Sequence, residues 1–305
     1  MQPPSRRTLL ALGLLTAVTA CTADPRGGAP AGPSPPRDAD TPARLRAVAD
    51  TDLLLGAYDG LLAAPGARTA LLQPLREDTA RHRAALAEGL PSASPSPTGT
   101  PDRPLTTPVD LARLEHRTAE SRLEGLDELS PPLARLLASV SASNALHAAA
   151  LGDQTPVRTP DGAAGTADPA AVPALQAALS GEHAAVYGYG VVGAHLTDDP
   201  GRTEARATHA AHQAQRDAWQ RLLTAATAAP TPAAGGYQLP FPVASAADAG
   251  RLAVHLETRL TAGYADLVAA LPAAYRPAAA TALRESALRA RRWGAPATAF
   301  PGLPA

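Results

Sequence analysis

The stretch Gly181-Glu-His-Ala-Ala-Val-Tyr-Gly-Tyr-Gly190 places an acidic residue inside an apolar helical pattern. Apolar or small side chains recur every three to four residues on both sides of Glu182, at Leu175, Leu179, Val186, Tyr189, Gly193 and Leu196. This spacing predicts one buried stripe along a helix. Because acidic side chains are rarely buried without a partner, we expect Glu182 to meet a compensating group in the core.

A second stretch, Thr208-His-Ala-Ala-His-Gln-Ala-Gln-Arg-Asp-Ala-Trp219, places histidines in a similar pattern. His212 shares a predicted helix face with His209, Trp219 and further apolar residues. An imidazole and a carboxylate are therefore expected to point into the same core. Carboxylates and histidines that converge between helices form the metal sites of some helix bundles.

Helical periodicity dominates the chain between its segments rich in proline and glycine. No segment alternates convincingly with the period of a strand, so the sequence predicts an all-α fold. The eight expected helices span residues 43–64, 67–89, 108–129, 132–151, 173–197, 202–228, 246–271 and 277–293.

Two parts of the chain resemble each other in the same order. Residues 129–152 align without a gap with residues 271–294, and Leu114-Glu-His-Arg117 matches Leu256-Glu-Thr-Arg259. We infer two related four-helix bundles in tandem. The expected boundaries are 43–152 for the N-terminal bundle, 153–172 for a linker and 173–305 for the C-terminal bundle.

Each predicted bundle carries one polar group per helix on or beside its apolar stripe. These groups are Glu182, His212, Glu257 and Glu285 in the C-terminal bundle, with His209 as a spare, and Asp52, His82, Glu115 and His147 in the N-terminal bundle. One hypothesis is a metal site. The other is a structural network, in which a buried acid pairs with an arginine such as Arg216, Arg259 or Arg289 and fixes the helix register.

Four motifs of the C-terminal half occur together. They are Leu179-Ser-Gly-Glu-His-Ala-Ala-Val-Tyr-Gly-Tyr-Gly-Val-Val-Gly-Ala-His195, Ala211-His-Gln-Ala-Gln-Arg-Asp217, Tyr237-Gln-Leu-Pro-Phe-Pro-Val243 and Phe300-Pro-Gly-Leu-Pro304. Through them the segment from Val172 to Pro304 resembles the uncharacterised ferritin-like domain found in actinobacterial lipoproteins. The resemblance implies a four-helix bundle and leaves the biochemical activity open.

The same resemblance allows a comparison of metal ligands. Ferritin-like di-iron proteins supply Glu, Glu-x-x-His, Glu and Glu-x-x-His from four successive helices. Here Glu182 matches the first position and Glu257 the third, while His209-Ala-Ala-His212 and Glu285-Ser-Ala-Leu288 each keep one of two ligands. A di-iron site is therefore not expected. A mononuclear site of nitrogen and oxygen ligands stays possible, and Fe, Mn or Zn would suit it.

The N-terminal segment has the layout of an export signal. Ser5-Arg-Arg-Thr-Leu-Leu10 leads into an apolar run that ends at Val18, and Val18-Thr-Ala-Cys21 resembles a bacterial lipobox. We expect a signal peptide over residues 1–20 and, over residues 21–42, a lipidated Cys21 followed by a flexible tether. The twin arginines leave open a twin-arginine or a general secretory route. The protein is expected on the extracytoplasmic face of the cell membrane, held there by the lipid.

Composition excludes several classes of chemistry. The 27 basic residues, all of them arginine, nearly balance 28 acidic residues, so no nucleic-acid partner is expected. The absence of lysine excludes Schiff-base catalysis, and the single cysteine excludes a disulfide within the chain. An aromatic content of 3% with abundant alanine predicts thin cores and no large apolar pocket.

Two functional hypotheses follow from the sequence. The first, which we favour, is a non-catalytic envelope lipoprotein that presents its bundles to a protein partner or to the cell wall. The second is a metal-binding or redox-active ferritin-like protein that uses the Glu/His cluster of the C-terminal bundle. The predicted anchor and fold suit both.

Overall fold

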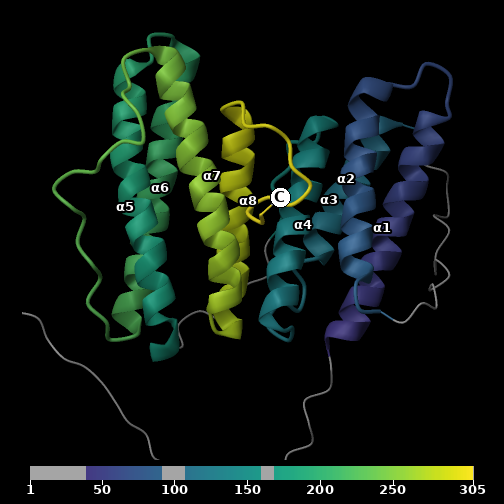
Figure 1. The fold of residues 1–305 in the computed structure, drawn as a ribbon, viewed down its shortest axis with the longest axis horizontal. Coiled ribbons are helices and arrows are strands. Elements are labelled where there is room, and N and C mark those ends of the chain that lie inside the picture. The colour runs from purple at the N-terminus through teal and green to yellow at the C-terminus, as the bar shows by residue number, and fades with distance from the viewer. Residues whose placement is uncertain (1–38, 91–106, 159–167, 305) are drawn as a thin grey trace, which may run out of the picture. The chain divides into compact units, whose positions relative to one another are not determined.

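A computed structural model describes residues 39–90, 107–158 and 168–304 (Figure 1). The predictions for the signal peptide, for Cys21 and for most of the tether lie outside these residues. Helices and turns account for the described segments, which contain no strand, so the all-α prediction is confirmed. The α-helices are α1 (Asp40–Leu62), α2 (Thr69–Ala87), α3 (Pro108–Ser121), α4 (Pro131–Ala150), α5 (Val172–His195), α6 (Asp199–Ala225), α7 (Ala246–Ala270) and α8 (Arg276–Arg292).

The helix ends follow from local capping chemistry. Asp198 accepts a hydrogen bond from the backbone N–H of Gly201, so α6 begins three residues before its predicted start. Ser245 caps α7 in the same way. The third helix, in contrast, ends at Ser121 and not at residue 129. Gly125 adopts the left-handed backbone conformation with φ of 68°, and turns replace the predicted last two turns of helix.

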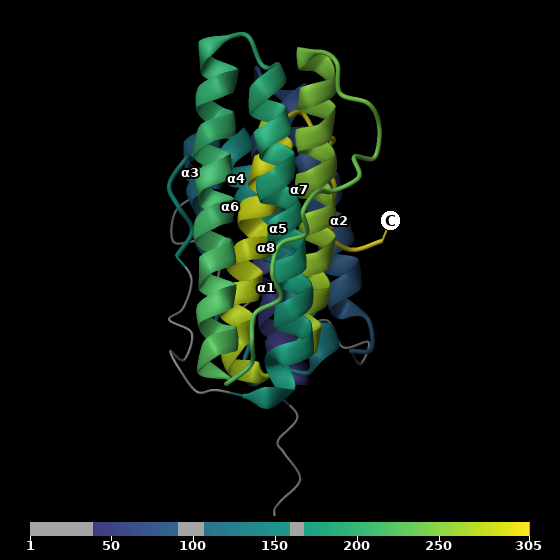
Figure 2. The ribbon, with the colours of Figure 1, turned by 90° about the vertical axis from the view of Figure 1, so that its left-hand side faces the viewer.

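The helices fall into two sets. In the C-terminal set, α5 packs against α6 and α7, and α7 packs against α8. Figure 2 shows α5, α6 and α7 running alongside one another, with α8 behind them. In the N-terminal set, α1 packs against α2 and α3, and α3 packs against α4.

The two sets share a hydrophobic core. Helix α4 packs against both α7 and α8, which lie beside it in Figure 1. One apolar cluster includes Leu133 of α4, Leu179 of α5 and Leu283 of α8, all of which are fully buried. The predicted bundles 43–152 and 173–305 are therefore in contact with each other.

The C-terminal segment after α8 joins the two sets further. Its Ala299 carbonyl accepts a hydrogen bond of 2.6 Å from Nε2 of His82 in α2. The hydroxyl of Ser139 in α4 donates to the Pro301 carbonyl at 2.8 Å. The Phe300 ring also meets the His82 ring edge to face, with 5.4 Å between centroids. The segment of residues 299–304, called the clasp below, thus connects the two sets of helices.

Gly302 is the tightest point of this clasp. Its φ of 81° lies in the left-handed region that side chains disfavour. A Cβ atom at this position would lie 2.6 Å from the Thr261 carbonyl oxygen of α7, which is too close for any real contact.

We predict that Gly302→Ala lowers the free energy of unfolding. The left-handed backbone alone costs about 1–2 kcal/mol, and the contact with Thr261 adds to it. Urea denaturation measures the difference. Gly250→Ala on α7 is the matched control, because a Cβ there meets nothing within 4 Å. Equal stability of the Gly302→Ala variant and the unchanged protein would show that the clasp does not contribute to folding.

Candidate functional site

A cluster of charged and polar side chains lies in the core of the C-terminal helices. Glu182 of α5, His212 of α6 and Glu257 of α7 all have 0% exposure. Nδ1 of His212 lies 2.8 Å from Oε2 of Glu182, and its Nε2 lies 3.0 Å from Oε1 of Glu257. Since both ring nitrogens face carboxylates, both donate, and the imidazole carries a positive charge.

Two tyrosines also donate hydrogen bonds to these carboxylates. The hydroxyl of Tyr189 donates to Oε1 of Glu257 at 2.8 Å, and that of Tyr264 donates to Oε1 of Glu182. Nε1 of Trp219 in turn donates to the Tyr264 hydroxyl at 3.3 Å. Burial raises the pKa of both phenols, so they stay protonated and act as donors.

Arg289 of α8 completes the cluster. Its Nε lies 3.1 Å from Oε1 and 3.2 Å from Oε2 of Glu257. Burial alone would raise the pKa of Glu257, but His212 and Arg289 outweigh it and hold that pKa below its ordinary value. For His212, burial alone would lower the pKa, but the two carboxylates raise it. Two carboxyl groups therefore meet two basic groups, with balanced formal charge.

The remaining candidate ligands lie elsewhere. Glu285 is 41% exposed and has Arg284 beside it, 3.6 Å away. His209 is partly buried and lines a separate pocket between α5 and α6. The structure thus brings together three of the five predicted metal ligands.

The cluster does not fit a divalent metal in this arrangement. A protonated imidazole has no lone pair to offer, and Arg289 already neutralises both oxygens of Glu257. Within residues 39–90, 107–158 and 168–304, no group of three or more His, Cys, Asp or Glu side chains is placed to hold a metal ion. The geometry favours a structural ion network over a metal site.

The sequence offers three arginines as possible partners of a buried acid. Of the three arginines considered, Arg289 makes the contact, Arg216 pairs with its neighbour Asp217, and Arg259 is exposed. Tyr189 belongs to the predicted apolar stripe, and its hydroxyl donates a hydrogen bond to Glu257 that the sequence does not predict. Helical spacing alone gives no signal for such a contact.

Comparison with known proteins identifies the domain that holds this cluster. Residues 174–305 match the family described as "Domain of unknown function (DUF4439)". The C-terminal half of the chain is a DUF4439 domain. A crystal structure of a conserved hypothetical protein from Mycobacterium tuberculosis is 40% identical and covers 41% of this chain and 94% of that chain, with a TM-score of 0.39. No curated protein matches.

The N-terminal helices contain a network that corresponds to that of the DUF4439 domain. Glu115 of α3 is fully buried and accepts hydrogen bonds from Tyr58 at 2.6 Å, Asn144 at 2.6 Å and His147 at 3.0 Å. The gap-free alignment of residues 129–152 with residues 271–294 pairs His147 with Arg289, and the shared Leu-Glu-x-Arg motif pairs Glu115 with Glu257. A buried acid on the third helix thus meets a tyrosine from the first and a basic group from the fourth in both halves. These matched contacts support the predicted duplication.

The other two polar positions of the N-terminal half do not join this network directly. Asp52 pairs with Arg83 at 2.5 Å on a partly exposed face. His82 donates to Ala299, while its ring lies 5.9 Å from that of His147. Burial and the nearby His147 hold the pKa of His82 well below its ordinary value, so it stays neutral. Asp78, which the sequence did not single out, lies 3.7 Å from His147 instead.

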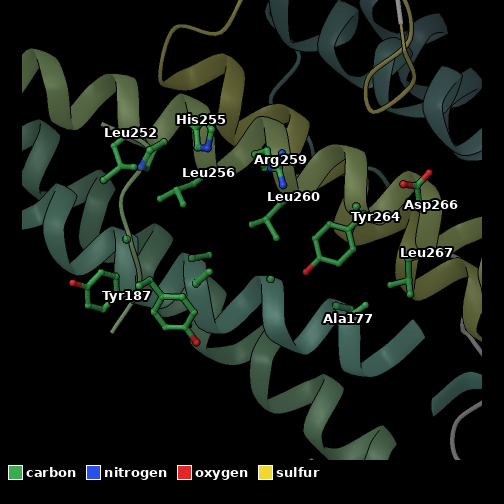
Figure 3. A pocket seen from close by; sticks show the side chains of 18 of the residues that line it. Ala177, Tyr187, Leu252, His255, Leu256, Arg259, Leu260, Tyr264, Asp266 and Leu267 are labelled. Carbon is green, nitrogen blue, oxygen red and sulfur yellow. The ribbon is translucent and has the colours of Figure 1, made fainter. Parts of the chain in front are cut away.

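A half-open groove between α5 and α7 is a second candidate site in the DUF4439 domain (Figure 3). Its volume of about 530 Å³ lies within the range of small-molecule sites. In Figure 3, Leu256 and Leu260 point from α7 toward α5, where alanines and glycines line the groove. The expectation of no large apolar pocket is wrong, because small side chains on one helix leave space beneath the leucines of the other.

We predict that Arg289→Met lowers the free energy of unfolding by about 3–5 kcal/mol, because Glu257 loses its permanent cation while buried. Arg292→Met is the matched control on the same helix. Arg292 pairs with Glu204 at the surface, where both side chains are at least 38% exposed, and the same change there costs at most about 1 kcal/mol. Chemical denaturation of both variants measures the difference. Equal losses would show that Glu257 does not depend on Arg289.

Proposed function

We propose that this protein is a non-catalytic component of the cell envelope, built from two ferritin-like bundles and held at the membrane by a lipid on Cys21. One observation carries the non-catalytic part. The buried carboxylate of Glu257 is closed off by Tyr189, His212 and Arg289, one partner from each of the other three helices.

A closed network of this kind suits a structural role. A general acid or base must come within hydrogen-bond reach of a substrate, whereas Glu182, His212 and Glu257 have no exposed surface. Their polar atoms are already used by one another and by the surrounding tyrosines and arginine. Such a network fixes which helix faces meet.

The ferritin-like part of the proposal is supported by ligand positions. Acids stand on the first and third helices of the DUF4439 domain and a histidine on the second, as the resemblance implies. On the fourth helix Arg289 faces the cluster, whereas Glu285 is partly exposed. A cation from the protein therefore stands beside the acids that would otherwise hold a metal.

The anchor part of the proposal comes from the lipobox ending at Cys21. Lipid attachment to one cysteine, followed by a tether, would hold the helices near the membrane surface. Among the helices that the structure describes, none is long and apolar enough to cross a bilayer.

The metal-binding alternative is favoured by the meeting of Glu182, His212 and Glu257 in one place. We predict that the purified protein, incubated with Fe²⁺, Mn²⁺ or Zn²⁺ at neutral pH, binds less than one equivalent, because His212 is protonated and Arg289 neutralises Glu257. Elemental analysis measures the bound metal. Thermal unfolding with and without a chelator measures whether metal binding stabilises the fold.

Matched variants make this metal experiment decisive. Stoichiometric metal that is lost in both Glu182→Gln and His212→Ala, but kept in Glu285→Gln, would replace the structural proposal by a metal site. The Glu285 variant serves as the control because that side chain lies outside the cluster.

We predict that Cys21→Ala prevents lipidation and releases the protein from the membrane fraction or leaves it unprocessed. Membrane fractionation and the mass of the processed chain measure the effect in a bacterial host that carries lipoprotein-processing enzymes. Thr22→Ala is the neighbouring control and keeps the anchor. Unchanged processing and fractionation of Cys21→Ala would show that the protein is not a lipoprotein.

A further inference from the structure

The groove between α5 and α7 is long. Its lining on α5 runs from Ala174 to Gly188, which is about 21 Å at the rise of an α-helix. This length suits one extended hydrocarbon chain.

The groove walls are apolar along most of this length. Leu252, Leu256, Leu260 and Leu267 contribute from α7, and small residues face them from α5. Gly188 lets the two helices approach, since a Cβ there would lie 2.6 Å from a methyl group of Leu256. Residues 237–240 flank the groove from the loop between α6 and α7.

Basic side chains stand beside these leucines. His255 and Arg259 lie one turn apart on α7 and both line the groove (Figure 3). Arg259 is exposed and makes no ion pair or hydrogen bond within the described residues. The acid of the groove, Asp266, is already paired with Arg135 at 2.5 Å. The groove therefore combines an apolar trough with an available cation.

A pocket of the N-terminal helices has a different character. It lies between α1, the turn after α3 and α4, and has a volume of about 380 Å³. Its lining includes Arg46, Asp50 and Glu124, so charges of both signs interrupt the apolar surface. This pocket therefore does not offer the uninterrupted apolar surface of the trough between α5 and α7.

We infer that the groove between α5 and α7 binds a long-chain fatty acid, with the hydrocarbon chain over Leu256 and Leu260 and the carboxylate at Arg259. The chain matches the length and apolarity of the trough. The carboxylate supplies the anion that Arg259 lacks, in a charge-assisted hydrogen bond. This inference goes beyond the proposed envelope role and does not depend on the anchor.

Titration calorimetry with palmitate below its aggregation concentration tests the inference. The protein used is residues 38–305, which form one compact unit. We expect saturable binding of one palmitate per chain. Failure of this binding would overturn the fatty-acid site and leave the anchoring proposal intact, because the tested segment lacks Cys21.

Variants that fill the groove with a larger side chain test whether palmitate binds there. Gly263 lines the trough on α7, and a Cβ there meets nothing within 4 Å, so Gly263→Leu adds bulk to the groove without a clash at its base. We expect at least tenfold weaker palmitate binding. Gly250→Leu on the same helix, also in open space but outside the groove, leaves binding unchanged. If Gly263→Leu does not fold, Ala177→Leu blocks the groove from α5.

The head group is tested separately. Arg259→Gln should weaken palmitate binding by about tenfold, as expected for a lost hydrogen bond between charged groups. Binding of hexadecanol, which has the same chain without the charge, should not change. Arg251→Gln is the control, since Arg251 is paired with Asp248 on the same helix.

Three results would overturn the inference. The first is equal palmitate affinity in Gly263→Leu, Ala177→Leu and the unchanged protein. The second is binding to phosphatidylglycerol vesicles without binding of free palmitate, which would assign the groove to a membrane surface. The third is self-association that Gly263→Leu abolishes in the absence of palmitate binding, which would assign it to a second copy of the chain.

Discussion

The neutralisation of the buried Glu257 carboxylate is the constraint on which the DUF4439 domain depends. A charge with no exposed surface loses several kcal/mol of hydration and must recover it from nearby partners. Here the partners Tyr189, His212 and Arg289 come from α5, α6 and α8. A shift of any one helix along its axis would break one of these contacts, so this cluster fixes the register of the four helices.

The two halves of the chain meet the same constraint with different side chains. Glu115 is held by His147 and Asn144, whereas the equivalent Glu257 is held by Arg289. His147 titrates, with a pKa of about 9 because the carboxylates of Glu115 and Asp78 overcome its burial, and Arg289 does not titrate in any ordinary solution. A metal site would require particular donor atoms. A structural network requires only a balancing positive charge, and that is what the two halves have in common.

Much of this arrangement follows from the sequence, and the rest does not for identifiable reasons. Glu182, His212 and Glu257 each interrupt an apolar stripe, so their convergence was predictable. The sequence does not show whether Glu285 or Arg289 faces the cluster. Helix α8 is buried on most sides, so its periodicity does not select one face. The early end of α3 depends on the backbone conformation of Gly125. The groove forms because large side chains on α7 face small ones on α5, and the pattern of a single helix does not show which helix it will face.

The network and the groove are linked through Tyr264. Its hydroxyl is bonded to Glu182 inside the cluster, and the same residue lines the groove between α5 and α7. The cluster therefore sets the spacing of the two helices that form the groove walls. A groove whose two walls are joined by buried hydrogen bonds needs little reorganisation when a chain enters it, so most of the energy from apolar contact remains available for affinity. In this proposal the buried charges take no part in chemistry. They contribute to binding by maintaining the shape of the groove between α5 and α7.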